Sequence, residues 1–173
     1  MYSKIGILRE GKNPPDKRVA LTPAQCLEVM QRYPGTDVVV QRSPVRAITD
    51  AEYEAAGVRL TDDLSDRDLL IGVKEVPVDM LLEGRSYQFF SHTIKQQPHN
   101  RKLLQAILAK RIRMIDHELL TDPKGDRVLA FGKWAGVVGA YNAFRSWQAT
   151  EGGPYLKPAY QCHDRAEMEQ HLH

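Results

Sequence analysis

Residues 4–41 read KIGILREGKNPPDKRVALTPAQCLEVMQRYPGTDVVVQ, and this stretch contains one complete strand–helix–strand unit. The apolar run Lys4–Leu8 predicts the first strand, and the β-branched run Asp37–Gln41 predicts the second. Between them, the pair Thr22-Pro23 is typical of a helix start, because threonine caps the first turn and proline suits the first helical position. A helix between two strands provides the crossover that parallel pairing requires.

The same alternation of strands and helices continues along the chain. Four more apolar runs predict strands at Asp68–Val73, Tyr87–Ser91, Ile112–Asp116 and Val128–Phe131. Helices are expected from the capping box Thr49–Glu52 to about Gly57, and at Pro98–Lys110 and Lys133–Trp147. Continuous apolar runs suit strands that are covered on both faces. We therefore expect an α/β fold with a doubly wound, three-layer parallel sheet of the Rossmann or flavodoxin-like kind.

The composition excludes several classes of protein. The chain has 173 residues, of which 42% are hydrophobic and 27% charged, so it can bury a core and is not disordered. A formal net charge of +2 gives no reason to expect a nucleic-acid partner. No apolar run approaches the roughly 20 residues that span a bilayer, and the first residues lack the apolar segment of a signal peptide. We expect a cytoplasmic protein with no membrane partner.

Metal-ligating residues are present but show no metal-binding spacing. Cys26 and Cys162 are the two cysteines, and neither lies in a CxxC motif. His163, His171 and His173 crowd the C-terminus, where they are expected to form a polar tail. The sequence therefore predicts two reduced thiols and no metal site.

Polar side chains follow four of the expected strands. In open α/β sheets, ligands bind outside the carboxyl ends of the strands. The residues at these ends are Arg9-Glu10, Lys74-Glu75, His92 with Lys95 after it, and His117-Glu118. A lysine and a histidine that face one substrate can share acid and base work on a carbonyl or imine, and an arginine can bind a carboxylate through two nitrogens. This set suits amino-acid or keto-acid chemistry, although solvated loops are polar in any case.

The stretch Gly132–Gly139 is the glycine-rich part of the chain, but it is not a GxGxxG motif. Close helix packing is the better interpretation, so no residue of this chain is assigned to a dinucleotide. After it, EGGPYLKP at residues 151–158 predicts a linker, and Asp164–Leu172 predicts a short helix.

Several motifs resemble a known family. GILREGKNPPDKRVALTP, starting at Gly6, is similar to the N-terminal signature of the alanine dehydrogenase and transhydrogenase superfamily. The strings GVKEVP, FFSHTIKQQPHNRKLL, RMIDHELL and GDRVLAFGKWAGVVGA resemble its saccharopine branch, namely the lysine-forming saccharopine dehydrogenases. They resemble still more the lysine-ketoglutarate reductase portion of the bifunctional enzyme of lysine breakdown. The resemblance extends from about Lys4 to Arg145.

The resemblance implies a domain plan and a reaction. Residues 1–148 would form the N-terminal, substrate-side domain, and residues 149–173 a linker and short helix leading toward an NAD(P)-binding domain that this chain lacks. NAD or NADP would bind mainly to that absent domain, so the isolated chain is expected to be inactive. The reaction joins the lysine ε-amine to the carbonyl of 2-oxoglutarate as an imine, which hydride reduces, or runs in reverse.

The resemblance also implies roles for single residues. Lys74 and His92 match the catalytic pair of the family. The residues expected from it to bind substrate are Arg18, Glu75, Glu118 and Arg127, with Arg18 on a substrate carboxylate. Lys95 joins this expected set from its place after a predicted strand.

Two other functions remain open at this point. One is a stand-alone module that binds an amino acid or keto acid without hydride transfer. The other is an alanine dehydrogenase-like enzyme, against which the string FSHTIK argues. Self-association through an exposed inter-domain face that includes Gly132–Ala140 is a further expectation. The direction of the reaction, the choice of NAD or NADP and the exact substrate stay undetermined.

Overall fold

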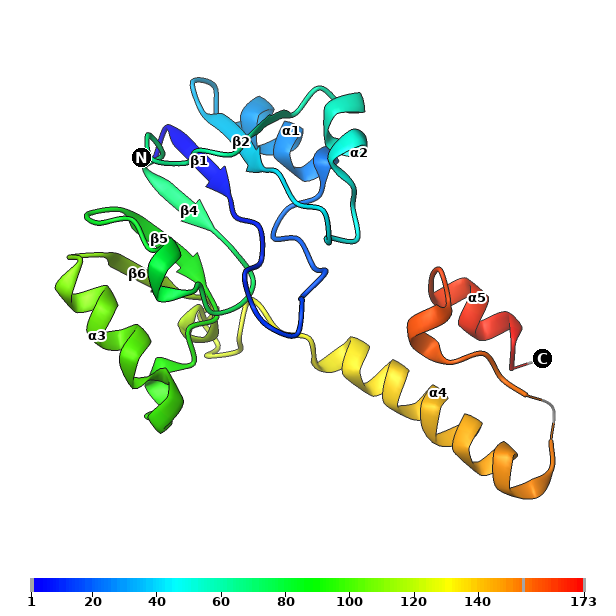
Figure 1. The fold of residues 1–173 in the computed structure, drawn as a ribbon. Coiled ribbons are helices and arrows are strands. Elements are labelled where there is room, and N and C mark those ends of the chain that lie inside the picture. Colours follow the sequence, from blue (N-terminus) through cyan, green and yellow to red (C-terminus); the bar gives the residue numbers. More distant parts are fainter. Residues whose placement is uncertain (1, 154, 173) are drawn as a thin grey trace. The chain divides into compact units, whose positions relative to one another are not determined.

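The sheet of the computed structural model has six strands in the order β3-β2-β1-β4-β5-β6, and every neighbouring pair is parallel (Figure 1). The strands are β1 Lys4–Ile7, β2 Asp37–Gln41, β3 Arg59–Thr61, β4 Leu69–Ile71, β5 Ser86–Phe89 and β6 Arg113–Asp116. The structure describes residues 2–153 and 155–172. The predicted linker residue Pro154 and tail residue His173 lie outside them.

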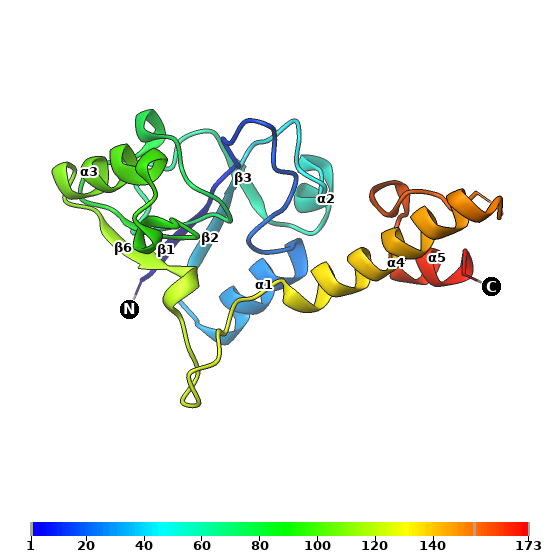
Figure 2. The ribbon, with the colours of Figure 1, turned by 90° about the horizontal axis from the view of Figure 1, so that it is seen from below.

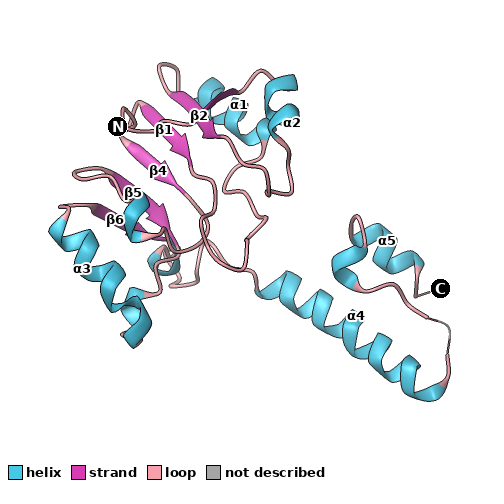
Figure 3. Ribbon diagram, viewed as in Figure 1, coloured by secondary structure: helices cyan, strands magenta, loops and turns pink. Residues whose placement is uncertain are grey.

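Helices cover both faces of this sheet (Figures 2 and 3). The cluster on one face joins β1 and β2 to α1 (Pro23–Arg32) and α2 (Asp50–Ala55), with Cys26 and Tyr53 buried among strand residues. The cluster on the other face joins β4 and β5 to α3 (Arg101–Ala109). Three layers result, which confirms the predicted doubly wound α/β fold.

Local sequence signals explain where the first two helices begin. The Thr22 hydroxyl accepts from the Gln25 amide at 3.3 Å, and the Gln25 side chain accepts from the Thr22 amide at 2.9 Å. Thr49 and Glu52 form the same reciprocal pair at the start of α2. Both are capping boxes, in which two otherwise unpaired helix amides find acceptors. Short 3₁₀ turns lie at Val78–Met80, Thr93–Lys95, Pro98–Asn100, His117–Leu119 and Ala159–Gln161.

Two strand assignments differ from the sequence prediction. Val128–Phe131 is not a strand, because the chain there leaves a small turn in which the Val128 amide donates to the Leu120 carbonyl. The side chain of Val128 is 62% exposed, so its apolar character does not reflect burial in the sheet. Conversely, β3 at Arg59–Thr61 was missed. It is an edge strand paired with β2 alone, and its half-exposed surface carries polar residues that conceal the strand.

The chain divides into two compact units, Met1–Val128 and Leu129–His173. The second contains α4 (Gly132–Glu151) and α5 (Arg165–Gln170) around a small core of Tyr141, Leu156 and Met168. The Tyr141 hydroxyl donates to the Lys157 carbonyl at 2.8 Å. These contacts tie α4 to the residues that follow it, and the domain boundary at residue 148 stays a prediction.

The order of the strands creates a switch point between β1 and β4. From β1 the chain builds outward through β2 and β3, and it then returns to β4 and builds the other half through β5 and β6. The loops that leave β1 and β4 therefore diverge at the carboxyl edge of the sheet. Ligands of open α/β sheets bind at such a point.

Candidate active site

The backbone that carries Lys74 is held from two sides at the switch point. Glu10, which follows β1, accepts from the Val73 amide at 2.7 Å and from the Lys74 amide at 2.8 Å. On the other side, the Nε2 atom of His117 lies 3.0 Å from the Gly72 carbonyl oxygen. Burial lowers the pKa of His117, so the neutral ring donates its Nε2 proton to that carbonyl. These contacts thus fix the backbone that follows β4 up to Lys74.

His92 and Glu75 form a close pair next to this segment. The Nδ1 atom of His92 lies 2.5 Å from Oε1 of Glu75, and each side chain is 19% exposed. Lys12 approaches the other oxygen of Glu75 at 3.3 Å. An Nδ1–H that donates to a carboxylate orients the imidazole ring and leaves Nε2 available to a ligand.

The electrostatics of the two carboxylates at the switch point differ. Burial alone would raise the pKa of Glu75, but hydrogen bonds and the charge of His92 hold the pKa below its usual value. Burial raises the pKa of Glu10, and the two backbone amides only partly offset this effect. Glu75 is therefore the anionic partner of His92, whereas Glu10 holds backbone.

The backbone at His92 adopts a left-handed conformation with φ of 52°. This region is uncommon for residues other than glycine, and such conformations concentrate at functional sites. The Phe90 ring lies nearly parallel to the His92 ring, with centroids 6.2 Å apart, and contacts the His117 ring at 5.1 Å. The two histidines therefore flank one aromatic ring at the carboxyl end of β5.

Glu118, which follows β6, forms a second charged group with Lys95 and Arg127. Its Oε1 atom lies 3.0 Å from Nζ of Lys95 and 2.9 Å from Nη2 of Arg127. The Glu118 side chain is only 4% exposed, and within the described residues its Oε2 atom has no hydrogen-bond partner. Burial opposes ionisation, but Lys95 and Arg127 hold the pKa of Glu118 below its usual value. A buried, ionised carboxylate with a free oxygen atom can accept a hydrogen bond from an N–H or O–H group of a ligand.

Arg18 pairs with Asp16 in the loop after β1. Nε and Nη2 of Arg18 lie 2.9 and 2.5 Å from the two carboxylate oxygens of Asp16. The hydrogen bond from Arg18 lowers the pKa of Asp16, and the positive charge of Lys74 contributes as well. The guanidinium thus already engages a carboxylate through two nitrogens, the mode predicted for its substrate.

All seven predicted site residues lie in the first unit, in three charged groups rather than one. These are the Glu75–His92 pair beside Lys74, the Glu118 group with Lys95 and Arg127, and Arg18 with Asp16. Sequence reasoning missed Glu10, Lys12 and Asp16 as partners. All three lie in the same loop as Arg18, and the density of ionisable residues in that loop was the available signal.

The glycine-rich stretch does not fit a dinucleotide. Gly132, Gly136 and Gly139 lie within α4 in the second unit, not in a turn between a strand and a helix. A dinucleotide cradle needs such a turn, with backbone amides directed at the phosphates. The described part of the chain therefore offers no such cradle at this stretch.

No helix in residues 2–153 and 155–172 is long and apolar enough to cross a membrane.

The fold and the site together define a class. It is an open parallel α/β domain whose switch point gathers ionisable side chains suited to acid–base chemistry on a small charged ligand. Residues 6–138 match the family described as alanine dehydrogenase/PNT, N-terminal domain, and the chain belongs to that family.

Curated relatives agree with the branch indicated by the sequence motifs. The chain is 43% identical over 141 residues to alpha-aminoadipic semialdehyde synthase of Arabidopsis thaliana, covering 78% of this chain and 13% of that protein. It is 33% identical over 146 residues to the NAD(+), L-lysine-forming saccharopine dehydrogenase of Emericella nidulans, covering 81% of this chain and 38% of the relative. The predicted branch is confirmed, and the chain spans only a minor part of these relatives.

A solved structure supports the fold. An L-alanine dehydrogenase superposes with a TM-score of 0.66 at 18% identity, covering 88% of this chain and 43% of that one. At this identity, the likeness concerns the fold alone.

Proposed function

We propose that this chain is the substrate-side half of an NAD(P)-dependent saccharopine-type oxidoreductase. The reaction would join the ε-amine of lysine to the carbonyl of 2-oxoglutarate and reduce the resulting imine to saccharopine, or run in reverse. The observation that carries the proposal is the Glu75–His92 pair, with its 2.5 Å contact, beside the fixed Lys74 segment. The saccharopine-type relatives support the same assignment.

The chemistry before hydride transfer consists of proton movements. The lysine ε-ammonium must lose a proton before nitrogen attacks the carbonyl carbon, and the resulting hydroxyl must gain one before it leaves as water. Nε2 of His92 is available for one of these transfers, because Nδ1 is engaged by Glu75. The Lys74 ammonium is the second proton carrier. Two side chains that can each accept or donate a proton suit a reaction that needs a base and then an acid.

The charged groups around the pair supply substrate binding. Arg18 binds a substrate carboxylate in the two-nitrogen mode that it shows with Asp16. Lys95 and Arg127 keep Glu118 ionised, and the free Oε2 atom of Glu118 accepts a hydrogen bond from the substrate amine. Substrates with both carboxylates and an amine therefore match the charges of the site.

Hydride transfer between the nicotinamide and the imine carbon is the chemistry that NAD(P) supplies. We assign its binding mainly to a further domain, because the glycine-rich stretch here lies within a helix. No step of the mechanism above depends on where the cofactor binds. Self-association through the face of Gly132–Ala140 and a location in the cytoplasm stay predictions.

The test is the substrate dependence of NAD(P)H oxidation by the intact protein that contains this chain. Oxidation that requires both lysine and 2-oxoglutarate supports the proposal. Oxidation with pyruvate and ammonium instead would favour the alanine dehydrogenase alternative. Binding of 2-oxoglutarate in calorimetry without turnover, with either nicotinamide cofactor, would favour a binding module. Both latter outcomes contradict the proposed function.

A further inference from the structure

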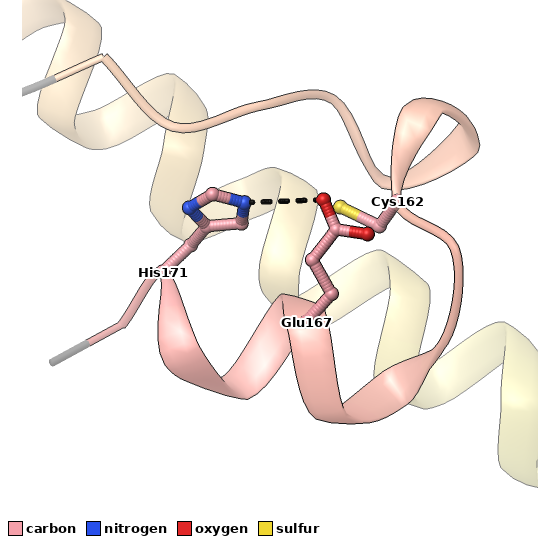
Figure 4. A group of neighbouring side chains, drawn as sticks. All are labelled: Cys162, Glu167 and His171. Carbon is pink, nitrogen blue, oxygen red and sulfur yellow. Dashed lines mark ion pairs between the residues drawn. The ribbon is translucent and has the colours of Figure 1, made fainter.

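Three potential metal ligands meet in the second unit, whereas the candidate active site belongs to the first. Cys162 follows the 3₁₀ turn Ala159–Gln161, and Glu167 and His171 lie on α5 and at its end. One ligand atom from each of the three lies within 4.8 Å of the others (Figure 4). We propose that Cys162, Glu167 and His171 bind a divalent ion of the zinc type. This inference departs from the sequence prediction of no metal and does not depend on the proposed function.

The backbone explains why these side chains converge. Glu167 and His171 are four residues apart, so they lie one above the other on the same face of α5. Nε2 of His171 lies 3.6 Å from Oε1 of Glu167. Asp164 caps the helix by accepting from the Glu167 amide at 2.9 Å, which turns the chain so that Cys162 faces the same side. All three ligands come from one short segment, and little chain entropy is lost in bringing them together.

The distances suit a small tetrahedral ion. Zinc binds sulfur at about 2.3 Å, and nitrogen or oxygen at about 2.0–2.2 Å. Two ligand atoms of a tetrahedral site are therefore about 3.2–3.8 Å apart. The 3.6 Å separation of the His171 and Glu167 atoms lies in this range. The separations of up to 4.8 Å in the trio need only small side-chain rotations to close.

The donor set selects the ion. Thiolate, imidazole and carboxylate together suit zinc and neighbouring transition metals, whereas magnesium and calcium prefer oxygen ligands alone. Three protein ligands leave the fourth position to water. The ion pair between Glu167 and His171 explains the position of those two side chains without a metal. Cys162 is therefore the ligand that distinguishes a metal site from an ion pair, and the test is directed at it.

Two neighbours of Glu167 shape the site. Its Oε2 atom accepts from the His163 amide at 2.5 Å, which orients the carboxylate as outer hydrogen bonds do for metal ligands. Its Oε1 atom pairs with the ammonium of Lys157, which competes with a metal ion for the same oxygen. Removal of Lys157 is therefore expected to strengthen metal binding.

The experiment is a Co²⁺ titration of the untagged chain under reducing conditions, followed by displacement with Zn²⁺. We expect a thiolate-to-cobalt charge-transfer band, visible bands typical of tetrahedral cobalt, and tighter binding of Zn²⁺. Cys162→Ser should abolish the charge-transfer band, and His171→Gln should weaken binding at least tenfold. His163→Gln is the matched control, because the exposed His163 side chain lies next to Asp164 and is not one of the three ligands. Lys157→Met should bind Co²⁺ several-fold more tightly than the wild type.

A second readout protects the test against variants that fold poorly. Zn²⁺ should raise the thermal unfolding midpoint of the wild-type chain, and it should not raise that of Cys162→Ser. The proposal is overturned if the wild type shows no thiolate band at millimolar Co²⁺. It is equally overturned if the band survives in Cys162→Ser, or if Lys157→Met leaves the affinity unchanged.

Discussion

Glu10 holds the segment that carries Lys74, and we predict that Glu10→Ala destabilises the first unit by about 1–3 kcal/mol. Its two oxygens accept from the Val73 and Lys74 amides at 2.7 and 2.8 Å. A hydrogen bond to a charged group contributes about 1.5–3 kcal/mol, and truncation removes two. The expected loss is less than their sum because the site lies at the open edge of the sheet, where water can bind the freed amides.

The assay combines urea unfolding of the chain with amide hydrogen exchange at Val73 and Lys74. Exchange at these two amides should accelerate in Glu10→Ala more than exchange in the middle of the sheet. Glu28→Ala is the matched control, because Glu28 is an exposed carboxylate on α1. A loss of stability below about 0.5 kcal/mol, the usual size for a surface substitution, together with unchanged exchange at both amides, would refute the reasoning.

The same residue has a pH signature. Because burial raises the pKa of Glu10, protonation of this carboxyl adds stability to the folded state, and this added stability is fully present below the pKa of the unfolded chain. That contribution is lost as the pH rises through the raised pKa of the folded state. Glu10→Gln cannot ionise, so the decline in stability over this weakly acidic interval should shrink in the variant. A decline of the same size in both proteins would contradict the assignment.

The pKa of Glu118 is lowered, so its contribution to stability is present above the pKa of the unfolded chain and is lost as the pH falls through the folded value. Glu118→Gln should flatten the acid limb of urea-unfolding stability against pH, and an unchanged limb would contradict this. Arg18→Lys should raise KM for 2-oxoglutarate about tenfold or more with a smaller effect on kcat, since lysine cannot bind a carboxylate through two nitrogens; equal effects on both would contradict the binding role. Burial raises the pKa of Cys26 to about 11, so alkylation followed by mass spectrometry should label Cys162 well before Cys26, and equal labelling would refute this.

Much of the fold could be predicted because its signals are local. The capping box of Thr49 and Glu52 and the proline after Thr22 mark helix starts through hydrogen bonds that span three residues. The edge strand β3 had no such signal, because it is only three residues long and Arg59 and Thr61, on either side of Leu60, are polar. The apolar run at Val128 gave a false signal, because periodicity alone does not distinguish a buried strand from an exposed loop.

The site was predictable at the level of residue types but not of pairs. Polar residues after parallel strands must meet at one edge, which placed Glu75 and His92 in one region but did not show that they pair. The pairing of Arg18 with Asp16 depends on the path of a loop, which no periodicity encodes. Glu10 was visible as a residue after β1, but its acceptance of two backbone amides depends on the register between β1 and β4.

The central claim is that Lys74 and His92 move protons on the substrate. Its most direct test is the turnover of Lys74→Met and His92→Gln in the intact protein that contains this chain, assayed by NAD(P)H oxidation with lysine and 2-oxoglutarate. Lys102→Met and His99→Gln, which change exposed residues near the start of α3, are the controls. The account predicts a fall in kcat of about 10²-fold or more for the first pair and little change for the controls. Turnover at the wild-type rate in both Lys74→Met and His92→Gln would contradict it.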